Sequence, residues 1–191
     1  MKALSTSLRA LLFFTILTGF MYPLFVTGIA QLAFKPKANG SLIIKDDRII
    51  GSELIGQQFD SSIYFSSRPS AIAYNPLPSG GSNLGPTSIK LKNNVHERTI
   101  LFNTINGFDS LKVVPSEMIF ASASGLDPHI SKAAAVLQVD RIARSRNFNS
   151  GQRIKLLNTI EEHTEAPQFG FLGMERVNVL ALNLALDNPE Y

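Results

Sequence analysis

The chain has no cysteine and no tryptophan, and it is poor in charge. Without cysteine it can form no disulfide framework, no thiolate-ligated zinc site and no iron–sulfur cluster. Charged residues make up 17% of its 191 residues, below the roughly 25% of an average soluble domain. Apolar residues still make up 45%. That share is enough for a packed core and excludes a globally disordered chain.

The motifs of nucleotide-binding enzymes and metalloproteins are also missing. Neither GxxxxGK[ST] nor GxGxxG occurs, so there is no P-loop and no dinucleotide fingerprint. No pair among His96, His129 and His163 is spaced i, i+3 or i, i+4, and we predict no protein-ligated metal. Ser124, Asp127 and His129 have the side chains of a hydrolytic triad, but three residues within six positions rarely reach its geometry. We favour a helix N-terminus there and predict no catalytic residue.

The excess of positive charge belongs to the N-terminal region alone. The formal net charge is +3, but removing the four basic residues of 1–37 leaves 14 basic and 15 acidic residues in 38–191. A balance of −1 lacks the basic face of a nucleic-acid-binding domain, so we predict no nucleic-acid partner. Arg141, Arg144 and Arg146 form the one local basic cluster, which we interpret as the solvated face of a helix.

A long uncharged run dominates the N-terminus. Residues 10–34 are 25 residues without a charge, and as a helix they would measure ~37 Å, enough to cross a ~30 Å hydrocarbon core. We predict one transmembrane helix at 10–34, in which Pro23 can introduce a kink. Gly28-Ile29-Ala30 would suit a signal peptidase, but the run exceeds the ~7–15 apolar residues of a signal peptide, which favours an uncleaved anchor.

The flanking charges predict the orientation of this anchor. Lys2, Arg9 and the α-amine precede the run, whereas only Lys35 and Lys37 follow it. By the positive-inside rule, three charges against two favour a cytoplasmic N-terminus. We therefore predict a cytoplasmic segment at 1–9 and an extracytoplasmic domain at 35–191.

The pattern of residues 35–191 combines short strands with amphipathic helices, which predicts an α+β domain. The predicted elements are a hairpin at 41–51 around Lys45-Asp46-Asp47, a helix at 86–107 ended by Gly107, a helix opened by Asp127-Pro128, a helix at 150–163 capped by Ser150 with Ile154, Leu157 and Ile160 inward, and a strand within 176–187.

A loop rich in small and turn-forming residues is predicted at 66–86. It holds four prolines, three glycines and five serines in 21 residues, and irregular segments of this length are often functional. Within it, Ser79-Gly80-Gly81-Ser82-Asn83 could form a backbone nest that binds an anion. An ordinary tight turn is the alternative, which the residues alone favour.

Five stretches of the sequence form a distinctive set, namely GSELIGQQF, YFSSRPSA, SGGSNLGP, ASASGLDPHIS and FGFLGMERVNVLALNLALD. Together with the N-terminal span they resemble, in order and nearly end to end, the C subunit of the bacterial Kdp potassium-transporting ATPase. The resemblance implies a single-pass subunit of the bacterial inner membrane without an active site of its own. Its implied partners are a channel-like subunit that carries K⁺, a P-type ATPase subunit that hydrolyses ATP, and a third, small membrane subunit.

The resemblance also implies a role linked to ATP. The family's C subunit is described as a catalytic chaperone that raises the ATP affinity of the ATPase subunit, which implies nucleotide contacts at Ser79, Gly80, Gly81, Ser82, Asn83 and Gln138. A domain on the outer face cannot touch cytoplasmic ATP, however. We therefore predict an accessory and assembly subunit with no cofactor of its own, sharing ATP at most with the ATPase subunit. The alternative is a membrane-anchored nucleotide-binding regulator with a cytoplasmic tail.

Overall fold

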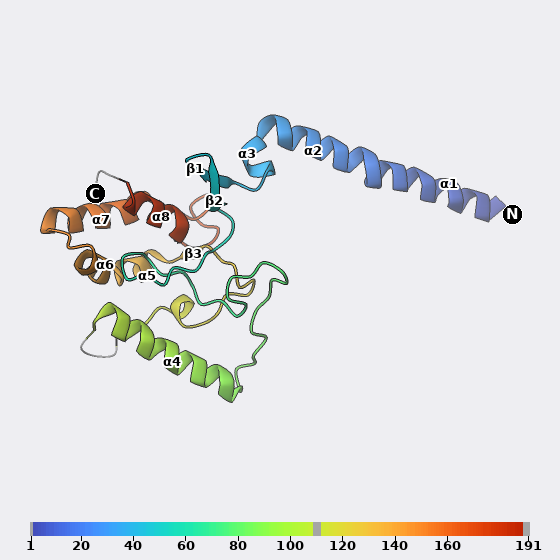
Figure 1. Cartoon of the computed structure of the whole chain (residues 1–191). Coiled ribbons are helices and arrows are strands. Elements are labelled where there is room, and N and C mark those ends of the chain that lie inside the picture. The colour runs from blue at the N-terminus through green and yellow to red at the C-terminus, as the bar shows by residue number, and fades with distance from the viewer. Residues whose placement is uncertain (1, 109–111, 189–191) are drawn as a thin grey trace. The chain divides into compact units, whose positions relative to one another are not determined.

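The structure, a computed structural model, describes residues 2–108 and 112–188 and divides the chain into two compact units, 1–50 and 51–191. The first unit consists of a long helical run and a hairpin (Figure 1). The second combines helices with a small sheet. The mixture of helix and strand that the sequence predicts is therefore confirmed.

The N-terminal helix is long and apolar enough to cross a membrane. It runs without interruption over Lys2–Ala33, 32 residues, or about 48 Å at 1.5 Å per residue. No residue of this helix is buried by the rest of the chain. Its parts are α1 (Lys2–Ile16), a π-helical turn η1 (Leu17–Met21) and α2 (Tyr22–Ala33), and the short helix α3 (Lys35–Ala38) follows.

Proline explains the π-helical turn. Pro23 has no N–H, and in a regular helix its ring would clash with the carbonyl four residues earlier. The wider turn η1 lies directly before it, and the N–H of Tyr22 reaches back five residues to the carbonyl of Leu17. The helix thus accommodates Pro23 by widening locally, as π-bulges do elsewhere.

The hairpin predicted at 41–51 is confirmed. Strands β1 (Leu42–Lys45) and β2 (Arg48–Ser52) pair with each other. Asp46 and Asp47 connect them with φ angles of 50° and 58°. Two successive left-handed residues are the pattern of a type I′ turn, whose twist matches that of the paired strands.

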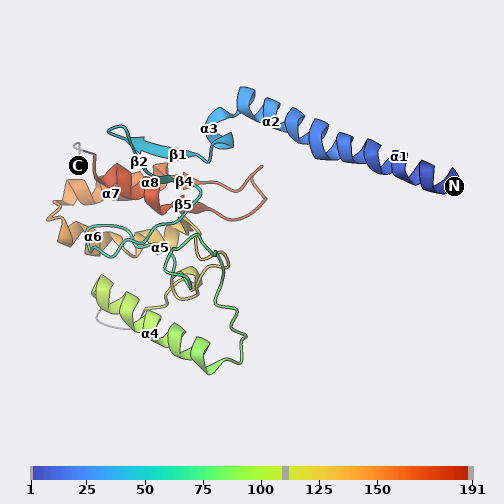
Figure 2. The ribbon, with the colours of Figure 1, turned by 45° about the vertical axis from the view of Figure 1, so that its right-hand side comes forward.

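The second unit packs helices α5 to α8 together with a three-stranded antiparallel sheet of order β3-β5-β4. In Figures 1 and 2 most of α4 lies away from these helices, but its C-terminal end meets α6, where Asn106 bonds to Arg141 and Arg144. The elements are α4 (Ile89–Asn106), the 3₁₀ turn η2 (Ser116–Met118), β3 (His129–Ile130), α5 (Lys132–Val136), α6 (Val139–Ser145), α7 (Ser150–Glu162), β4 (Thr164–Glu165), β5 (Arg176–Asn178) and α8 (Val179–Leu186).

The core lies where α5 to α8 meet the sheet. Its fully buried side chains include Phe65, Val139, Ile142, Leu156, Ile160, Val177 and Leu182. On α7 the predicted inward residue Ile160 is buried, but Ile154 is 58% exposed and Leu156 takes the inward position. The helix is therefore rotated slightly from the predicted orientation.

Three helix starts differ from the predictions. Helix α4 begins at Ile89 rather than at Pro86, and the Oγ of Ser88 caps it by accepting from the N–H of Leu91. Asp127-Pro128 does not open a helix, because His129–Ile130 pairs with β5 and α5 begins only after Ser131, whose Oγ accepts from the N–H of Ala134. Helix α7 is capped by Asn149 rather than by Ser150: Asn149 and Gln152 exchange two hydrogen bonds in a capping box. By contrast, α4 ends at a left-handed Gly107 (φ 69°), as predicted.

The predicted strand at 176–187 is mostly a helix. Only Arg176–Asn178 pairs as β5, after which Asn178 accepts from the N–H of Ala181 and starts α8. Helix α8 is apolar on nearly all sides. Val179, Leu180, Leu182 and Leu186 are buried, while Ala181, Leu184 and Ala185 are half-buried. An all-round apolar helix lacks the one-sided period that distinguishes a helix from a buried strand.

The arginine cluster is not a solvated face, which corrects the interpretation from the sequence. Arg141 is 3% exposed and donates to the carbonyl of Ser62 (2.6 Å) and to the side chains of Asn106 and Gln138. Arg146 donates to the carbonyl of Ile63 (2.8 Å). Arg144 is exposed at the surface, but it too donates to a carbonyl, that of Asn106 at the end of α4. These hydrogen bonds attach residues 62–63 and the C-terminal end of α4 to α6.

Candidate functional site

The predicted loop residues 79–83 lie against the segment 122–125. The N–H of Gly80 donates to the carbonyl of Ser124 at 3.0 Å. A Cβ on Gly81 would stand 3.0 Å from the carbonyl oxygen of Ala123, so the two backbones lie close together there. Ser79, Ser82 and Asn83 are exposed to solvent. Gly81 therefore has a packing function, whereas a Cβ on Gly80 would meet nothing within 4 Å, and the polar side chains of the loop face outward.

Gln138 lies in the interior, with its amide fully engaged. It has no exposed surface, and its Oε1 accepts from the N–H of Ser66 and from Arg141, both at 2.8 Å. Its Nε2 donates to the carbonyl of Ala134 at 3.2 Å. Within residues 2–108 and 112–188, no hydrogen bond joins Gln138 to residues 79–83. The six predicted nucleotide contacts thus fall into two separate places.

Segment 122–130 is where the distinctive stretches of the sequence converge. The N–H of Gly56 donates to the carbonyl of Leu126 (2.7 Å), and the N–H of Ser122 donates to that of Pro69 (3.1 Å). The N–H of Val179 reaches the carbonyl of Pro128 (2.9 Å). Segment 122–130 thereby connects GSELIGQQF with RVNVLALNLALD, which lie far apart in the sequence. SGGSNLGP also contacts this segment, through Gly80.

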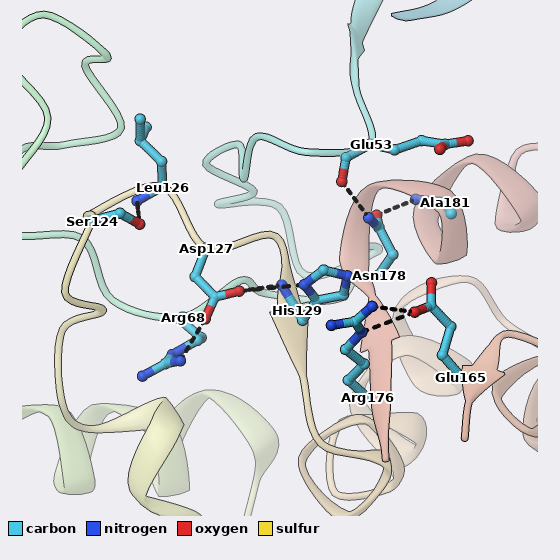
Figure 3. A network of polar contacts seen from close by, with 10 residues as sticks. All are labelled: Glu53, Arg68, Ser124, Leu126, Asp127, His129, Glu165, Arg176, Asn178 and Ala181. Atoms are coloured by element: carbon cyan, nitrogen blue, oxygen red, sulfur yellow. Dashed lines mark hydrogen bonds and ion pairs between the residues drawn. The ribbon is translucent and has the colours of Figure 1, made fainter. Parts of the chain in front are cut away.

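Arg68, Asp127 and His129 form the charged centre of this segment. Figure 3 shows Arg68 and His129 directed at the carboxylate of Asp127 from two sides. The guanidinium Nη1 of Arg68 lies 2.6 Å from Asp127 Oδ2, and the backbone N–H of His129 donates to Oδ1 at 3.0 Å. The His129 ring Nδ1 is 3.5 Å from the same oxygen. The carboxylate therefore bridges YFSSRPSA and ASASGLDPHIS.

This environment keeps Asp127 ionised. Burial by itself would raise the pKa of the carboxyl, but the hydrogen bonds from His129 and the Arg68 guanidinium outweigh it and lower the pKa of Asp127 to about 2. The structure does not assemble a triad from these residues. Ser124 Oγ accepts from the N–H of Leu126, and no hydrogen bond between Ser124 and His129 occurs in the part of the chain that the structure describes.

Two hollows adjoin this centre, and Arg68 lines both. One is a cavity of about 600 Å³ beneath α4, where irregular chain at 58–74 faces Phe102 and Ile105. The other is a groove of about 930 Å³ between Asp127, His129 and the β4–β5 loop. Neither is lined by Ser79–Asn83 or Gln138. Among residues 2–108 and 112–188, no group of three His, Asp or Glu side chains is placed to hold a metal ion.

Arg68 and Asp127 both lie in the distinctive stretches of the sequence, but the sequence predicts no shared function for them. They are 59 positions apart, and no local pattern pairs residues at that distance. The available signal was indirect: two charged residues stood in stretches otherwise dominated by serine, glycine and apolar side chains.

Comparison with known proteins decides the family. The model of the family described as "KdpC: K+-transporting ATPase, c chain" matches residues 4–188. The chain belongs to the KdpC family. The resemblance read from the sequence is thereby confirmed, and the KdpC chain is by its description one chain of a K⁺-transporting ATPase.

Curated KdpC relatives match this chain along its whole length. The potassium-transporting ATPase KdpC subunit of Mycobacterium tuberculosis is 47% identical over 188 residues, covering 97% of this chain and 98% of its own length. That of Geobacter sulfurreducens is 48% identical over 191 residues, covering 98% of both. That of Koribacter versatilis is 47% identical over 192 residues, covering 99% of this chain and 96% of its own.

Proposed function

We propose that this chain is the accessory and assembly subunit of an ATP-driven K⁺ uptake complex in the bacterial cell membrane. The observation that carries the proposal is the KdpC family match over residues 4–188. It is supported by the N-terminal helix Lys2–Ala33, which can anchor the chain. The partners would be the channel-like subunit, the P-type ATPase subunit and a third small membrane subunit, with K⁺ as cargo.

Co-purification from K⁺-starved bacteria tests the assembly function. Tagged full-length chain, extracted in mild detergent, is expected to bring down the channel-like and ATPase subunits with K⁺-stimulated ATPase activity. Deleting the chain is expected to abolish that activity in membranes that still contain the other subunits. Full K⁺-dependent activity without the chain would overturn the proposal.

The proposed orientation places residues 1–9 in the cytoplasm and the domain 35–191 outside. Its support is the surplus of positive charge before the helix, from Lys2, Arg9 and the α-amine. Because the chain contains no cysteine, single variants Ser5→Cys and Asn93→Cys can be labelled with an impermeant maleimide in intact cells. Labelling is expected at position 93 alone until the membrane is opened. The reverse pattern would favour a nucleotide-binding regulator with a cytoplasmic tail.

We further propose that any effect on ATP affinity is indirect. Gln138 would have to abandon its bonds to Ser66 and Arg141 to touch a nucleotide. A subunit that favours one conformation of the ATPase subunit changes its ATP affinity without contact, typically by ~1–3 kcal/mol. The test compares the dissociation constant for ATP, measured by binding rather than by turnover, in complexes carrying the wild-type chain, the double variant Ser82→Ala/Asn83→Ala, or no chain. Weaker ATP binding with the double variant would support direct contact, and weaker binding confined to the missing chain supports coupling.

A further inference from the structure

The loop between β4 and β5 exposes a group of large apolar side chains. Phe169, Phe171, Leu172 and Met174 are 86%, 75%, 50% and 83% exposed. Residues 166–174, which we call the apolar tip, contain no charged residue. Figure 2 shows this loop projecting from the second unit. Contiguous exposed apolar side chains on a folded domain mark interaction sites.

The apolar tip has a defined backbone. Gln168 and Leu172 exchange two backbone hydrogen bonds of 3.0 and 2.9 Å, and the N–H of Gly170 donates to the carbonyl of Pro167. A tip fixed in this way loses little conformational entropy when it binds, which favours affinity.

The conformation of Phe169 is costly in the isolated chain. Its φ is 54°, in the left-handed region that bulky residues rarely adopt. The same side chain is 86% exposed. Covering the ring would remove the cost of its exposure, whereas the backbone cost remains and has to be offset by other contacts. Such local costs gather at functional sites.

The base of the tip carries an excess of negative charge. Glu165 pairs with Arg176 at 2.8 Å, and Glu161 pairs with Lys132. Glu175 also interacts electrostatically with Lys132. The two cations Lys132 and Arg176 therefore stand against four carboxylates, those of Glu161, Glu162, Glu165 and Glu175. The apolar tip is thus uncharged at its end and acidic at its base.

This charge pattern selects the partner. Segments that insert into a bilayer surface combine Trp, Phe or Leu with Lys or Arg, whose positive charge binds anionic headgroups. The apolar tip contains Phe169 and Phe171 but no Lys or Arg, and the residues at its base carry an acidic excess. Exposed Phe and Met with a polar rim are instead typical of protein interfaces, in which opposite charges face each other.

We infer that the apolar tip is a docking arm, which inserts Phe169 and Phe171 into an apolar pocket with a basic rim on another subunit of the K⁺-transporting ATPase. This inference rests on the proposed function and identifies the surface that performs the assembly. The groove beside Asp127 is continuous with the arm, since Leu172, Met174 and Arg176 line it.

Photo-cross-linking in the assembled complex tests the docking arm. A benzophenone amino acid replaces Phe171 in the full-length chain, expressed together with the other subunits. A second chain carries it at Ile89, which is 77% exposed at the start of α4. A cross-link from position 171 to another subunit, absent from position 89, is expected. Cross-links from position 171 only to lipid, only to a second copy of this chain, or to nothing would overturn the inference.

A variant series separates this inference from the proposed function. Phe169→Ser/Phe171→Ser is expected to lower the yield of co-purified subunits at least tenfold, the order expected for losing two anchor residues. The control Ile89→Ser is expected to co-purify normally. If the wild-type chain brings down no subunit, the proposed function fails. If the wild type and the double variant bring down the subunits equally, only the docking arm fails.

Discussion

Segment 62–66 and the apolar tip are both irregular chain, but they differ in how their backbone groups are bonded and in whether their apolar side chains are buried. Segment 62–66 is held in the second unit, where Phe65 has no exposed surface. Its backbone groups bond to side chains: Ser62 to Arg141, Ile63 to Arg146, Ser66 to Gln138, and Phe65 through both its N–H and its carbonyl to Asn183. The tip satisfies its backbone internally and leaves its apolar side chains in solvent.

The comparison separates architectural residues from available ones. Buried backbone needs a partner for every polar group, so the polar side chains around segment 62–66 are committed to the fold. The apolar side chains of the tip are not needed by the fold in this way, because they remain exposed to solvent in the isolated chain. A functional surface is therefore more readily found among the exposed apolar residues than among the buried polar ones.

Removing Arg141 tests the structural function of the side chains around segment 62–66, and we expect it to give the largest change in the free energy of unfolding. Arg141→Leu leaves the carbonyl of Ser62 and the side-chain oxygens of Asn106 and Gln138 without this donor. The side chains of Asn106 and Gln138 are buried, whereas Ser62 is at the surface, so losing this donor is expected to lower the free energy of unfolding by about 3 kcal/mol. Urea unfolding of the full chain in detergent, followed by far-UV circular dichroism, measures it.

Arg153→Leu is the matched control. It removes an arginine of similar size from a solvent-exposed pair with Asp140, which is expected to cost about 0–1 kcal/mol. Equal losses in the two variants would show that Arg141 is no more structural than a surface arginine.

Asp127 should give the next largest effect, and one that depends on pH. Its pKa in the folded chain is about 2 against an ordinary value of 3.8. Because the folded pKa is depressed, the stabilisation is fully present above about pH 4–5 and is lost as the pH falls toward 2. Asp127→Asn is therefore expected to cost about 2 kcal/mol at pH 7.

The measurement is urea unfolding of wild type and Asp127→Asn between pH 7 and pH 2.5, with Asp140→Asn as the surface control. The difference in the free energy of unfolding between wild type and Asp127→Asn should become smaller as the pH falls. A difference that stays constant over this range would show that ionisation of Asp127 does not stabilise the fold.

Local signals predicted the local features of the molecule. The uncharged run at 10–34 predicted the N-terminal helix, Asp46-Asp47 predicted the turn between two β-branched segments, and Gly107 predicted the end of α4. Each depends only on neighbouring residues: the hydropathy of one helix, or the left-handed conformation that Gly and Asp tolerate best. The domain boundaries and the extracytoplasmic location of residues 35–191 remain predictions.

Most of the features that the sequence did not predict depend on contacts between residues far apart in the chain. Arg141 is buried because segment 62–66, almost 80 positions away, supplies a carbonyl for it. The candidate site depends on the same kind of contact, since Arg68 and Asp127 meet only in the folded chain. Residues 179–186 carry apolar side chains on nearly all sides of the helix, which removes the one-sided hydrophobic period by which a sequence predicts a helix.

The start of α7 offers a smaller, local test. Asn149 and Gln152 form the capping box, whereas Ser150, the cap expected from the sequence, is the first helical residue. Asn149→Ala is expected to lower the free energy of unfolding by about 1 kcal/mol, and Ser150→Ala by far less. Urea unfolding of both variants decides between the two caps, and a larger loss with Ser150→Ala would reverse the assignment.

The apolar tip should give the smallest change in stability, and its sign is the informative part. Glycine adopts the left-handed region without steric cost, so Phe169→Gly is expected to stabilise the isolated chain by about 0.5–1 kcal/mol. Met174 is similarly exposed but does not have a positive φ, so Met174→Gly is expected to destabilise it by about as much.

Urea unfolding of the two glycine variants measures these opposite signs, and co-purification of the other subunits is assayed in parallel. Phe169→Gly should unfold at higher urea yet recover less of the complex, because the ring that strains the tip is the ring that docks. A variant that is more stable and assembles as well as the wild type would show that the strain at Phe169 serves no partner. A variant that is less stable would show that the left-handed conformation costs the isolated chain nothing.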